Sequence, residues 1–428
     1  MTRVIVTGGG WAGCAAALAA RKAGAEAIIY EKTDMLLGCG LAGGIMRNNG
    51  RFTAAEEAIA LGAGELFRIA DTAARHKNVN FPGHNHATLY DATKIEPIVR
   101  RYLIDIGIEI NFMSRVVDIN KKGDAIEEII LADDTKIEGD VFIETTGSSG
   151  PMGNCLKYGN GCCMCVQRCP AFGPRVSLSN KAGAKDLIGK RTKEIYGAMS
   201  GSCKLNKDTL GPAIREELDE KGVVVVSIPE KLIKKEKLSM KVCQQYALDD
   251  YAQNIVLLDT GYAKLMTPFF SLADIRTIEG FENVRFEDPY AGGKGNSIRY
   301  MSMAPRNNYM QVIGVENLFC AGEKSGPFVG HTEAICTGIL AGHNSVRKAL
   351  GIKLLSLPSD LVIGDIISFV NDQLKTDEGL HKRFTFAGST YFGRMKQLGF
   401  YETSPDTIKM KVERLGLSGV FNQNLVNS

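Results

Sequence analysis

Five cysteines lie close together in one stretch of the chain, with spacing typical of a metal site. The stretch between residues 154 and 174 contains Cys155, Cys162, Cys163, Cys165 and Cys169. The run Cys162-x2-Cys165-x3-Cys169, followed by proline, repeats the last three ligands of a bacterial ferredoxin motif and predicts a [4Fe-4S] cluster. Cys155 or Cys203 would supply the fourth thiolate. Zinc, a redox-active dithiol and inert buried cysteines remain alternatives, because the first C-x2-C step of a ferredoxin is missing.

Three further side chains are candidates for catalysis. Cys39 lies in LLGCGLAGG, where a thiol can add to a substrate, although small residues of this kind can also serve only packing. Cys203 is followed by Lys204, whose charge would favour the reactive thiolate. His331 precedes a helical pattern and is the best single proton donor in the chain. Cys39, Cys203 and His331 are therefore the predicted catalytic residues.

A glycine turn near the start of the chain predicts a dinucleotide site. Gly8, Gly10 and Gly13 match G-x-G-x-x-G and lie between a β-branched run, residues 3–7, and an alanine-rich helix, residues 14–23. A second strand follows and ends at Glu31, which is placed to bind ribose hydroxyls. The whole is a βαβ unit whose helix N-terminus faces the phosphates. These residues alone leave the choice between NAD and FAD open.

Two later segments resemble motifs of the glutathione-reductase-like flavoprotein superfamily. GDVFIETTG resembles its second FAD motif, and NLFCAGE resembles the third, in which the acid reaches the ribityl chain or pyrophosphate. The resemblance implies FAD, held by residues from all three motifs and their neighbours. These are Gly8, Gly10, Trp11, Ala12, Gly13, Glu31, Lys32, Gly38, Val117, Thr146, Gly147, Gly322, Glu323, Gly330 and Thr332.

The resemblance also bears on the source of electrons. A second strand-linked G-x-G-x-x-G does not occur in the sequence, so a separate NAD domain is not expected. Transient NAD(P)H, a partner protein or the predicted cluster would reduce the flavin. The helix that follows the third motif would point its N-terminus at the flavin N1 and C2 carbonyl and stabilise the anionic reduced form.

More narrowly, residues 280–347 resemble the corresponding part of the glucose-inhibited division protein A family. That family and its relatives, the folate- and FAD-dependent tRNA uridine methyltransferases, share the order of the FAD motif and the glycine-rich helix. The first 35 residues fit as well, whereas the middle of the chain does not. The resemblance implies a second reading of the function, an FAD-dependent enzyme that modifies uridine in tRNA.

The pattern of elements predicts an α/β fold with three parts. Residues 1–150 and 316–350 form a Rossmann-like FAD-binding domain, with a parallel sheet and a β-meander over residues 114–147. Residues 151–315 form an inserted α+β substrate domain that is rich in cysteine, and residues 351–428 form a helical C-terminal region. The main functional hypothesis is an FAD-dependent oxidoreductase with a cysteine-rich electron relay. The tRNA-modifying enzyme described above is the second hypothesis, and a non-catalytic electron-carrier subunit is the third.

Composition places the chain among ordinary globular proteins. A net charge of +3 from 51 basic and 48 acidic residues gives no field that would seek polyanions, so a nucleic-acid partner is not expected. A small-molecule substrate or an electron-transfer partner is expected instead, with homo-oligomers left open. The N-terminus lacks the pattern of a secretory signal, and no apolar run approaches the length of a membrane span. We therefore expect a cytoplasmic location without membrane attachment.

Overall fold

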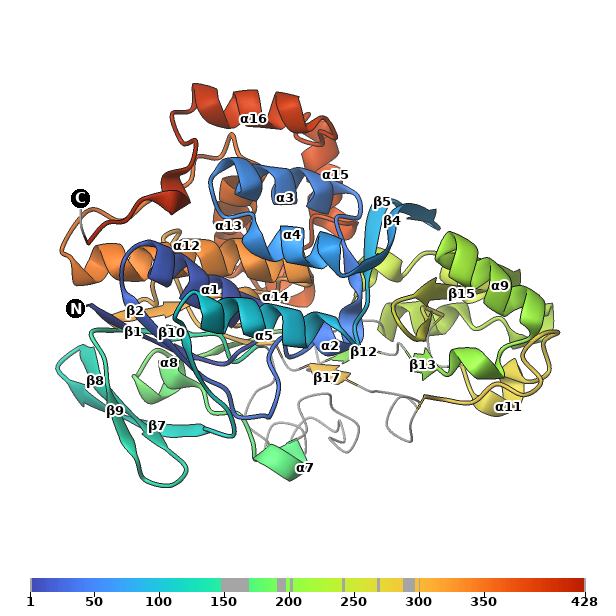
Figure 1. Cartoon of the computed structure of the whole chain (residues 1–428), viewed down its shortest axis with the longest axis horizontal. Coiled ribbons are helices and arrows are strands. Elements are labelled where there is room, and N and C mark those ends of the chain that lie inside the picture. Colours follow the sequence, from blue (N-terminus) through green and yellow to red (C-terminus); the bar gives the residue numbers. More distant parts are fainter. Residues whose placement is uncertain are drawn as a thin grey trace.

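The sheet with the most strands in the described part of the computed structural model is parallel and has the strand order β19-β10-β1-β2-β6; its strands β1, β2 and β10 lie at the left of Figure 1. The structure describes residues 2–147, 169–190, 198–200, 203–240, 243–267, 270–287, 297–299 and 301–426. The strands of this sheet are β1 (Arg3–Thr7), β2 (Glu26–Tyr30), β6 (Glu109–Asn111), β10 (Val141–Glu144) and β19 (Leu318–Cys320). The order reverses at β1, between β2 and β10, which is where α/β folds place their ligands.

The first βαβ unit forms as predicted, with one difference in its helix. Helix α1 (Trp11–Lys22) begins inside the glycine motif, so Gly13 lies in its first turn rather than in the loop. The helix ends where Gly24 takes a left-handed conformation with φ of +97°, which glycine adopts without steric penalty. β1 then pairs in parallel with both β2 and β10.

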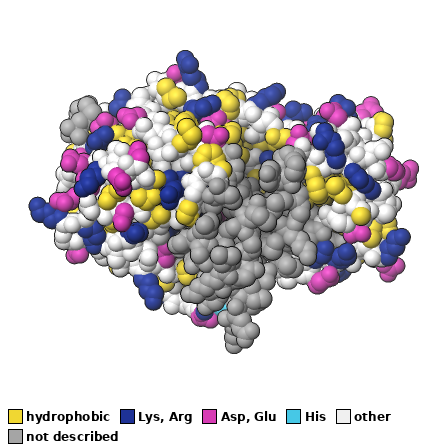
Figure 2. Space-filling view, turned by 90° about the horizontal axis from the view of Figure 1, so that it is seen from below, with side chains coloured by type: hydrophobic (Ala, Val, Ile, Leu, Met, Phe, Trp, Pro, Cys, Tyr) yellow, Lys and Arg dark blue, Asp and Glu magenta, His cyan; other side chains and the backbone are white. Residues whose placement is uncertain are grey.

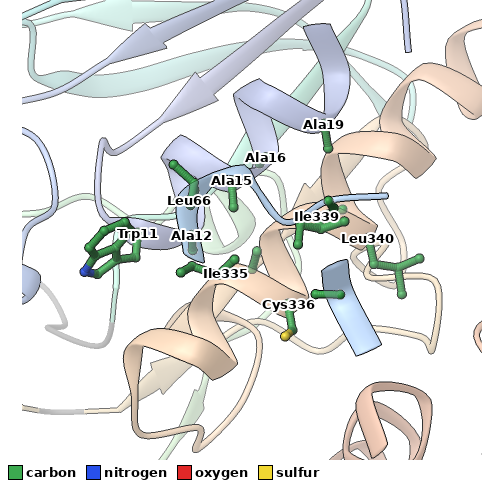
Figure 3. Packing of buried hydrophobic residues seen from close by; sticks show 14 of the residues in the cluster. Trp11, Ala12, Ala15, Ala16, Ala19, Leu66, Ile335, Cys336, Ile339 and Leu340 are labelled. Carbon is green, nitrogen blue, oxygen red and sulfur yellow. The ribbon is translucent and has the colours of Figure 1, made fainter. Parts of the chain in front are cut away.

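Helix α1 packs against α12 (His331–Ala349) through small residues, as Figure 3 shows. Alanines on α1 meet the face of α12 that carries Ile335 and Ile339. The backbones come so close that a Cβ atom on Gly338 would lie 2.3 Å from the Ala12 carbonyl oxygen. A Cβ atom on Gly342 would lie 2.1 Å from the Ala16 carbonyl oxygen. The two helices are therefore held in one fixed arrangement.

Replacing Gly342 by valine should destabilise the protein strongly. The new side chain would overlap a backbone carbonyl that cannot rotate away, and overpacking of this kind costs about 1–3 kcal/mol or more. The matched control is Gly393→Val in α15 (Ser389–Gln397), where no atom lies within 4 Å of an added Cβ and only helix propensity changes. Urea unfolding of both variants tests the prediction, which fails if they are equally stable.

Two smaller sheets are also present. The meander β7 (Val116–Lys122), β8 (Ala125–Leu131) and β9 (Lys136–Glu138) is antiparallel, as predicted. Between β2 and β6, the chain forms helices and the hairpin β4 (Ala74–Phe81) and β5 (His84–Tyr90), which pairs with β3 (Ile45–Met46). The helices there are α2 (Gly40–Gly43), α3 (Gly50–Ala60), α4 (Glu65–Thr72) and α5 (Ile95–Asp105).

The described part of the insert contains an antiparallel sheet, at the right of Figure 1. Its strands, in spatial order, are β13 (Cys203–Leu205), β16 (Ala263–Leu265), β15 (Asn254–Asp259) and β14 (Val223–Ser227). Helix α9 (Pro212–Lys221) packs on β14 and β15, and a hydrophobic cluster of its own fills the space beneath. The short helices α8 (Leu178–Lys181) and α11 (Leu272–Ile275) also belong to the described part.

The regular elements in the described part of the C-terminal region are helices. They are α13 (Val362–Gln373), α14 (Asp377–His381), α15 and α16 (Pro405–Arg414), followed by a 3-10 turn, Val420–Asn422. Buried Glu57 of α3 accepts hydrogen bonds from the Val362 and Ile363 amides, 3.0 and 3.2 Å away. These donors are the unpaired N–H groups of the first turn of α13. The region thus rests on the first part of the chain, and the predicted α/β fold class is confirmed.

A buried imidazole beneath the C-terminal segment should make stability depend on pH. His343 of α12 is fully buried against the Phe421 ring, and both ring nitrogens lack a hydrogen-bond partner among the described residues. Burial, with a smaller contribution from Arg347, lowers the pKa of His343 to about 4. Between these two pKa values, about 6.5 in the unfolded chain and about 4 in the folded chain, His343 is protonated only when the chain is unfolded.

We expect the free energy of unfolding to fall as the pH is lowered from 6.5 toward 4. His343→Leu removes this term, so the stability difference between variant and wild type should shift by about 2 kcal/mol in favour of the variant between pH 7.5 and pH 5. Urea unfolding at both pH values provides the measurement. A difference that does not change with pH would contradict the prediction.

In the described ranges, no helix combines the length and apolar character that a membrane span requires. On the face shown in Figure 2, basic and acidic side chains are interspersed, and neither sign gathers into one patch. This mixture agrees with the small net charge of the sequence.

Candidate functional site

A cleft lies at the carboxyl ends of β1, β2 and β10, and we divide it into two halves. The dinucleotide half is lined by the glycine turn and by residues 30–33, 114–116, 145–147, 174–176 and 321–323. The reaction half is lined by residues 39–43, by Arg51, by the loop that carries Cys243, Gln245 and Tyr246, by Lys264 and by residues 329–331. The position matches the switch point of the sheet.

The glycine turn has the geometry of a phosphate cradle. Gly8 has φ of +102°, and a Cβ there would lie 2.7 Å from the Thr145 carbonyl oxygen, so only glycine fits. Gly13 allows α1 to approach the turn, since its Cβ would lie 1.9 Å from the Gly8 carbonyl oxygen. Gly10 differs, because nothing lies within 4 Å of its Cβ position. Open space at the N-terminus of α1 is what a diphosphate requires.

Glu31 stands where the sequence placed it, at the end of β2, and it also fixes the turn. One carboxylate oxygen accepts the Gly9 amide at 2.6 Å, and the other accepts the Thr33 amide at 2.8 Å. A carboxylate oxygen has a second lone pair, so each can still accept a ribose hydroxyl. The side chain is largely buried and lines the cleft.

The second and third motifs complete the dinucleotide half. Thr145, at the end of β10, donates through its hydroxyl to the Gly8 carbonyl at 2.6 Å, which ties the second motif to the first. The Gly322 amide donates to the Thr337 hydroxyl of α12 at 2.9 Å, which ties the third motif to the helix after it. Glu323 lines the cleft beside them. All three motifs therefore meet in one site.

Most of the residues predicted to hold the cofactor line the cleft. They are Gly8, Gly10, Trp11, Ala12, Glu31, Lys32, Gly38, Thr146, Gly147, Gly322, Glu323 and Gly330. Gly13, Val117 and Thr332 do not. Gly13 packs α1 onto the turn, and Thr332 is fully buried in α12. Val116, not Val117, lines the cleft, because neighbouring residues of a strand point to opposite faces.

Several lining residues were not predicted from the sequence. Arg175 is largely buried, and its Nη1 atom lacks a partner among the described residues. The same atom lies 2.9 Å from the Cβ position of Gly147, at the second motif. Lys264 of β16 lines the reaction half and donates to the Ala42 carbonyl. The described lining thus carries five cationic side chains, namely Lys32, Arg51, Arg115, Arg175 and Lys264, against the two carboxylates Glu31 and Glu323.

Cys39 and His331 both line the reaction half, as the prediction of catalytic roles requires. Tyr90 donates its hydroxyl proton to the Gly40 carbonyl at 2.8 Å, so its oxygen accepts a hydrogen bond from His331 Nδ1 at 3.2 Å. Burial raises the pKa of Tyr90, which keeps this hydroxyl protonated. With the proton on Nδ1, His331 Nε2 is the basic nitrogen of the neutral ring.

Cys203, the third predicted catalytic residue, lies elsewhere. It is 1% exposed in the hydrophobic cluster of the insert and is not part of the cleft lining. Lys204 points to the opposite face of β13, where it donates to the Leu41 carbonyl at 3.2 Å. The structure therefore does not bring Cys203 to Cys39 and His331.

A buried ion pair borders the reaction half. Arg51 of α3 donates through Nε to both carboxylate oxygens of Glu333, each 3.1 Å away. Burial alone would lower the pKa of Arg51, but the Glu333 carboxylate outweighs it and raises that pKa. Glu333 also accepts the Thr385 hydroxyl at 2.7 Å and the Phe386 amide at 2.8 Å. The pair thus joins α3, α12 and the C-terminal region at the cleft wall.

The predicted cluster ligands cannot be placed. Cys155, Cys162 and Cys165 lie outside the described residues, as does the side chain of Cys169. Within the described ranges, no group of three or more His, Cys, Asp or Glu side chains could hold a metal ion.

A family model and two curated relatives are similar to this chain. The family model for glucose inhibited division protein A matches residues 3–246 and 265–353. The tRNA uridine 5-carboxymethylaminomethyl modification enzyme of Chlorobaculum tepidum is 33% identical over 115 residues, which are 25% of this chain and 18% of that protein. The methylenetetrahydrofolate–tRNA-(uracil-5-)-methyltransferase of Caldicellulosiruptor bescii is 29% identical over 109 residues, which are 26% and 24% of the two chains.

Among solved structures, GidA of Aquifex aeolicus is similar with a TM-score of 0.62 and 18% identity, over 96% of this chain and 76% of that one. At this identity the likeness concerns the fold. The curated relatives are matched over less than a quarter of their length. The family model, in contrast, matches most of the chain and confirms the resemblance drawn from residues 280–347. The chain belongs to the glucose-inhibited division protein A family.

Proposed function

We propose that the protein is an FAD-dependent enzyme that modifies the uracil base of a tRNA uridine. The observation that carries the proposal is the cleft itself, which joins a diphosphate cradle to a half that holds a thiol and an imidazole. Both curated relatives named above are, by their names, enzymes that act on uridine or uracil in tRNA. The sequence predicted this function as the alternative to an oxidoreductase with an electron relay, and the names of the two relatives favour it.

The residues of the dinucleotide half fit FAD. The open space at Gly10, the buried Arg175 Nη1 and the remaining oxygen lone pairs of Glu31 match a diphosphate and a ribose. Glu323 and the N-terminus of α12 lie at the junction with the reaction half, where positive helix-end charge favours an anionic ring. FAD, when bound, supplies hydride and one-carbon redox chemistry that protein side chains lack.

The lining of the cleft also favours an anionic substrate. Five cationic side chains against two carboxylates make it more basic than the chain as a whole, although Glu333 neutralises Arg51. The small net charge argued against a nucleic-acid partner, but a net charge averages over such local differences. A flipped nucleotide, with its phosphates at the rim, suits this lining.

Cys39 and His331 have the chemistry that substitution at uracil C5 requires. Carbon C5 becomes nucleophilic when a thiolate adds to C6, so Cys39 Sγ would form a bond to C6. C5 would then attack the methylene carbon of methylenetetrahydrofolate and lose its proton to a base, and the donor's C–N bond would break with tetrahydrofolate as the leaving group. A hydride that comes ultimately from NADPH would reduce the resulting exocyclic methylene, and the S–C6 bond would break to restore the ring and the thiolate. His331 Nε2, oriented through Tyr90, is the candidate base.

The test is modification of a tRNA transcript. The FAD-loaded protein is incubated with transcript, methylenetetrahydrofolate and NADPH, and digested nucleosides are measured by mass spectrometry. A C5-substituted uridine is expected with the wild type, and Cys39→Ser should abolish it. Cys203→Ser, whose side chain lies outside the cleft, should retain it. Absence of any new nucleoside with FAD-loaded, folded protein would contradict the proposal.

A second candidate function rests on the cysteine run. The spacing of Cys162, Cys165 and Cys169 still predicts a [4Fe-4S] cluster, with Cys155 as fourth ligand, that relays electrons to the flavin. Anaerobic purification followed by iron and sulfide counts decides this: about four irons per chain are expected for one cubane. A protein without iron and with freely titrating thiols would leave the FAD-dependent oxidoreductase without its relay.

A further inference from the structure

Gln245 is a buried residue that lines the reaction half of the cleft. It comes from the insert, in the short 3-10 turn Gln244–Tyr246, and is only 4% exposed. Its Oε1 atom has no hydrogen-bond partner among the described residues. An acceptor buried in this way costs about 1–3 kcal/mol, so such groups are normally paired, and a ligand in the cleft would supply the partner.

The backbone of Gln245 is held firmly, although its side-chain oxygen is unpaired. Its carbonyl accepts a hydrogen bond from His84 Nε2 at 3.0 Å, which places the His84 proton on Nε2. His84 Nδ1 then accepts from Asn48 Nδ2 at 2.9 Å, and Asn48 Oδ1 accepts from Arg51 Nη1 at 3.0 Å.

The base of the Gln245 side chain packs closely against Gly388. A Cβ atom on Gly388 would lie 2.6 Å from Gln245 Cβ. The position is therefore built from the hairpin, α3 and the C-terminal region together, as a preorganised binding group would be.

An amide side chain matches a particular ligand edge. Its oxygen accepts one hydrogen bond, and its nitrogen donates to a neighbouring carbonyl. An imide, in which an N–H lies beside carbonyl groups, is complementary to this pair in a bidentate way. A carboxylate would instead bring an acceptor against Oε1, and its charge is better met by Lys264 on the same lining.

We propose that Gln245 is a specificity residue that reads the imide edge of a planar heterocycle bound in the reaction half. Two molecules in the proposed reaction carry this edge: the pyrimidine ring of the flavin, and the uracil base of the substrate. The uracil alternative rests on the proposed function, whereas the flavin alternative does not. In either, the imide N–H donates to Gln245 Oε1, and Gln245 Nε2 donates to the adjacent carbonyl.

The experiment compares ligands that differ only at the imide nitrogen. One arm titrates apoprotein with FAD and with 3-methyl-FAD, followed by flavin fluorescence and the visible spectrum. The other titrates the FAD-loaded protein with a short RNA hairpin that contains uridine or 3-methyluridine, followed by anisotropy. The wild type should bind the methylated ligand about 10–100-fold more weakly in one arm, the loss expected for one or two hydrogen bonds. The arm in which this loss is measured shows whether Gln245 binds the imide edge of the flavin or that of the uracil.

Variants assign the discrimination to Gln245. Gln245→Leu should bind both ligands of that arm equally, whereas Gln244→Leu, in the same turn but outside the cleft lining, should keep the wild-type ratio. Thermal melts establish that both variants are folded. The proposal is overturned if the wild type discriminates in neither arm or if Gln245→Leu still discriminates.

The proposed function can fail separately. Discrimination in the flavin arm without any modified nucleoside leaves the role of Gln245 standing and removes the uridine function. Modified uridine without discrimination in either arm supports the uridine function and removes the role proposed for Gln245.

Discussion

Gly10→Val should abolish FAD binding and leave the fold unchanged. The backbone at Gly10 is extended, with φ of −64°, and no atom lies within 4 Å of an added Cβ, so valine is accommodated. Its methyl groups would occupy the space in which the diphosphate meets the N-terminus of α1. Each lost charge-assisted hydrogen bond is worth about 1.5–3 kcal/mol, so affinity should fall about 100-fold or more. Isothermal titration with FAD measures the loss.

Gly13→Val provides the contrast for this prediction. Only three residues away, its Cβ would lie 1.9 Å from the Gly8 carbonyl oxygen, so this variant should fail to fold. Circular dichroism and thermal melts separate the two outcomes. Tight FAD binding by a folded Gly10→Val protein would contradict the assignment of this turn as the phosphate cradle.

Glu333→Gln is expected to lower the free energy of unfolding by about 3–5 kcal/mol, the usual cost of breaking a buried ion pair. The amide keeps nearly the same shape but leaves the Arg51 guanidinium, which is 2% exposed, without its counter-charge. Guanidinium unfolding of both proteins at pH 7.5 measures the difference.

The double variant Arg51→Met with Glu333→Gln tests the cause. Removing the cation as well should recover much of the lost stability, because no unpaired charge is then buried. If the double variant is as unstable as the sum of the two single variants, the ion pair is not the source of the effect. Surface pairs such as Arg101 and Asp105 offer a control, since their loss costs about 0–1 kcal/mol.

Local patterns identified residues that mostly line the dinucleotide half of the cleft. The strand, glycine turn and acidic residue of the first unit lie within 35 residues, so short-range spacing specifies them. The departures from the lining have simple geometric causes. Val117 was predicted to hold the cofactor, whereas Val116 lines the cleft, one residue away in a two-residue period. Lys204 was expected to act on Cys203, but adjacent strand residues point to opposite faces.

The reaction half was much less predictable. Arg51, Gln245 and Lys264 come from separate elements, and their positions depend on how α3, the insert turn and β16 pack around the cleft. No spacing within the sequence connects them. Cys39 and His331 could be chosen because each lies beside a recognisable motif, whereas the partner Tyr90 is brought to them by the hairpin.

The close contact between α1 and α12 also determines the order in which the chain can mature. Helix α1 ends at Lys22, yet the partner that covers its alanine face begins only at His331. β1 likewise has one unpaired edge until β10 has been synthesised. During synthesis the first βαβ unit therefore exposes apolar surface until α12 has been made, which favours chaperone binding and delays cofactor loading to that point.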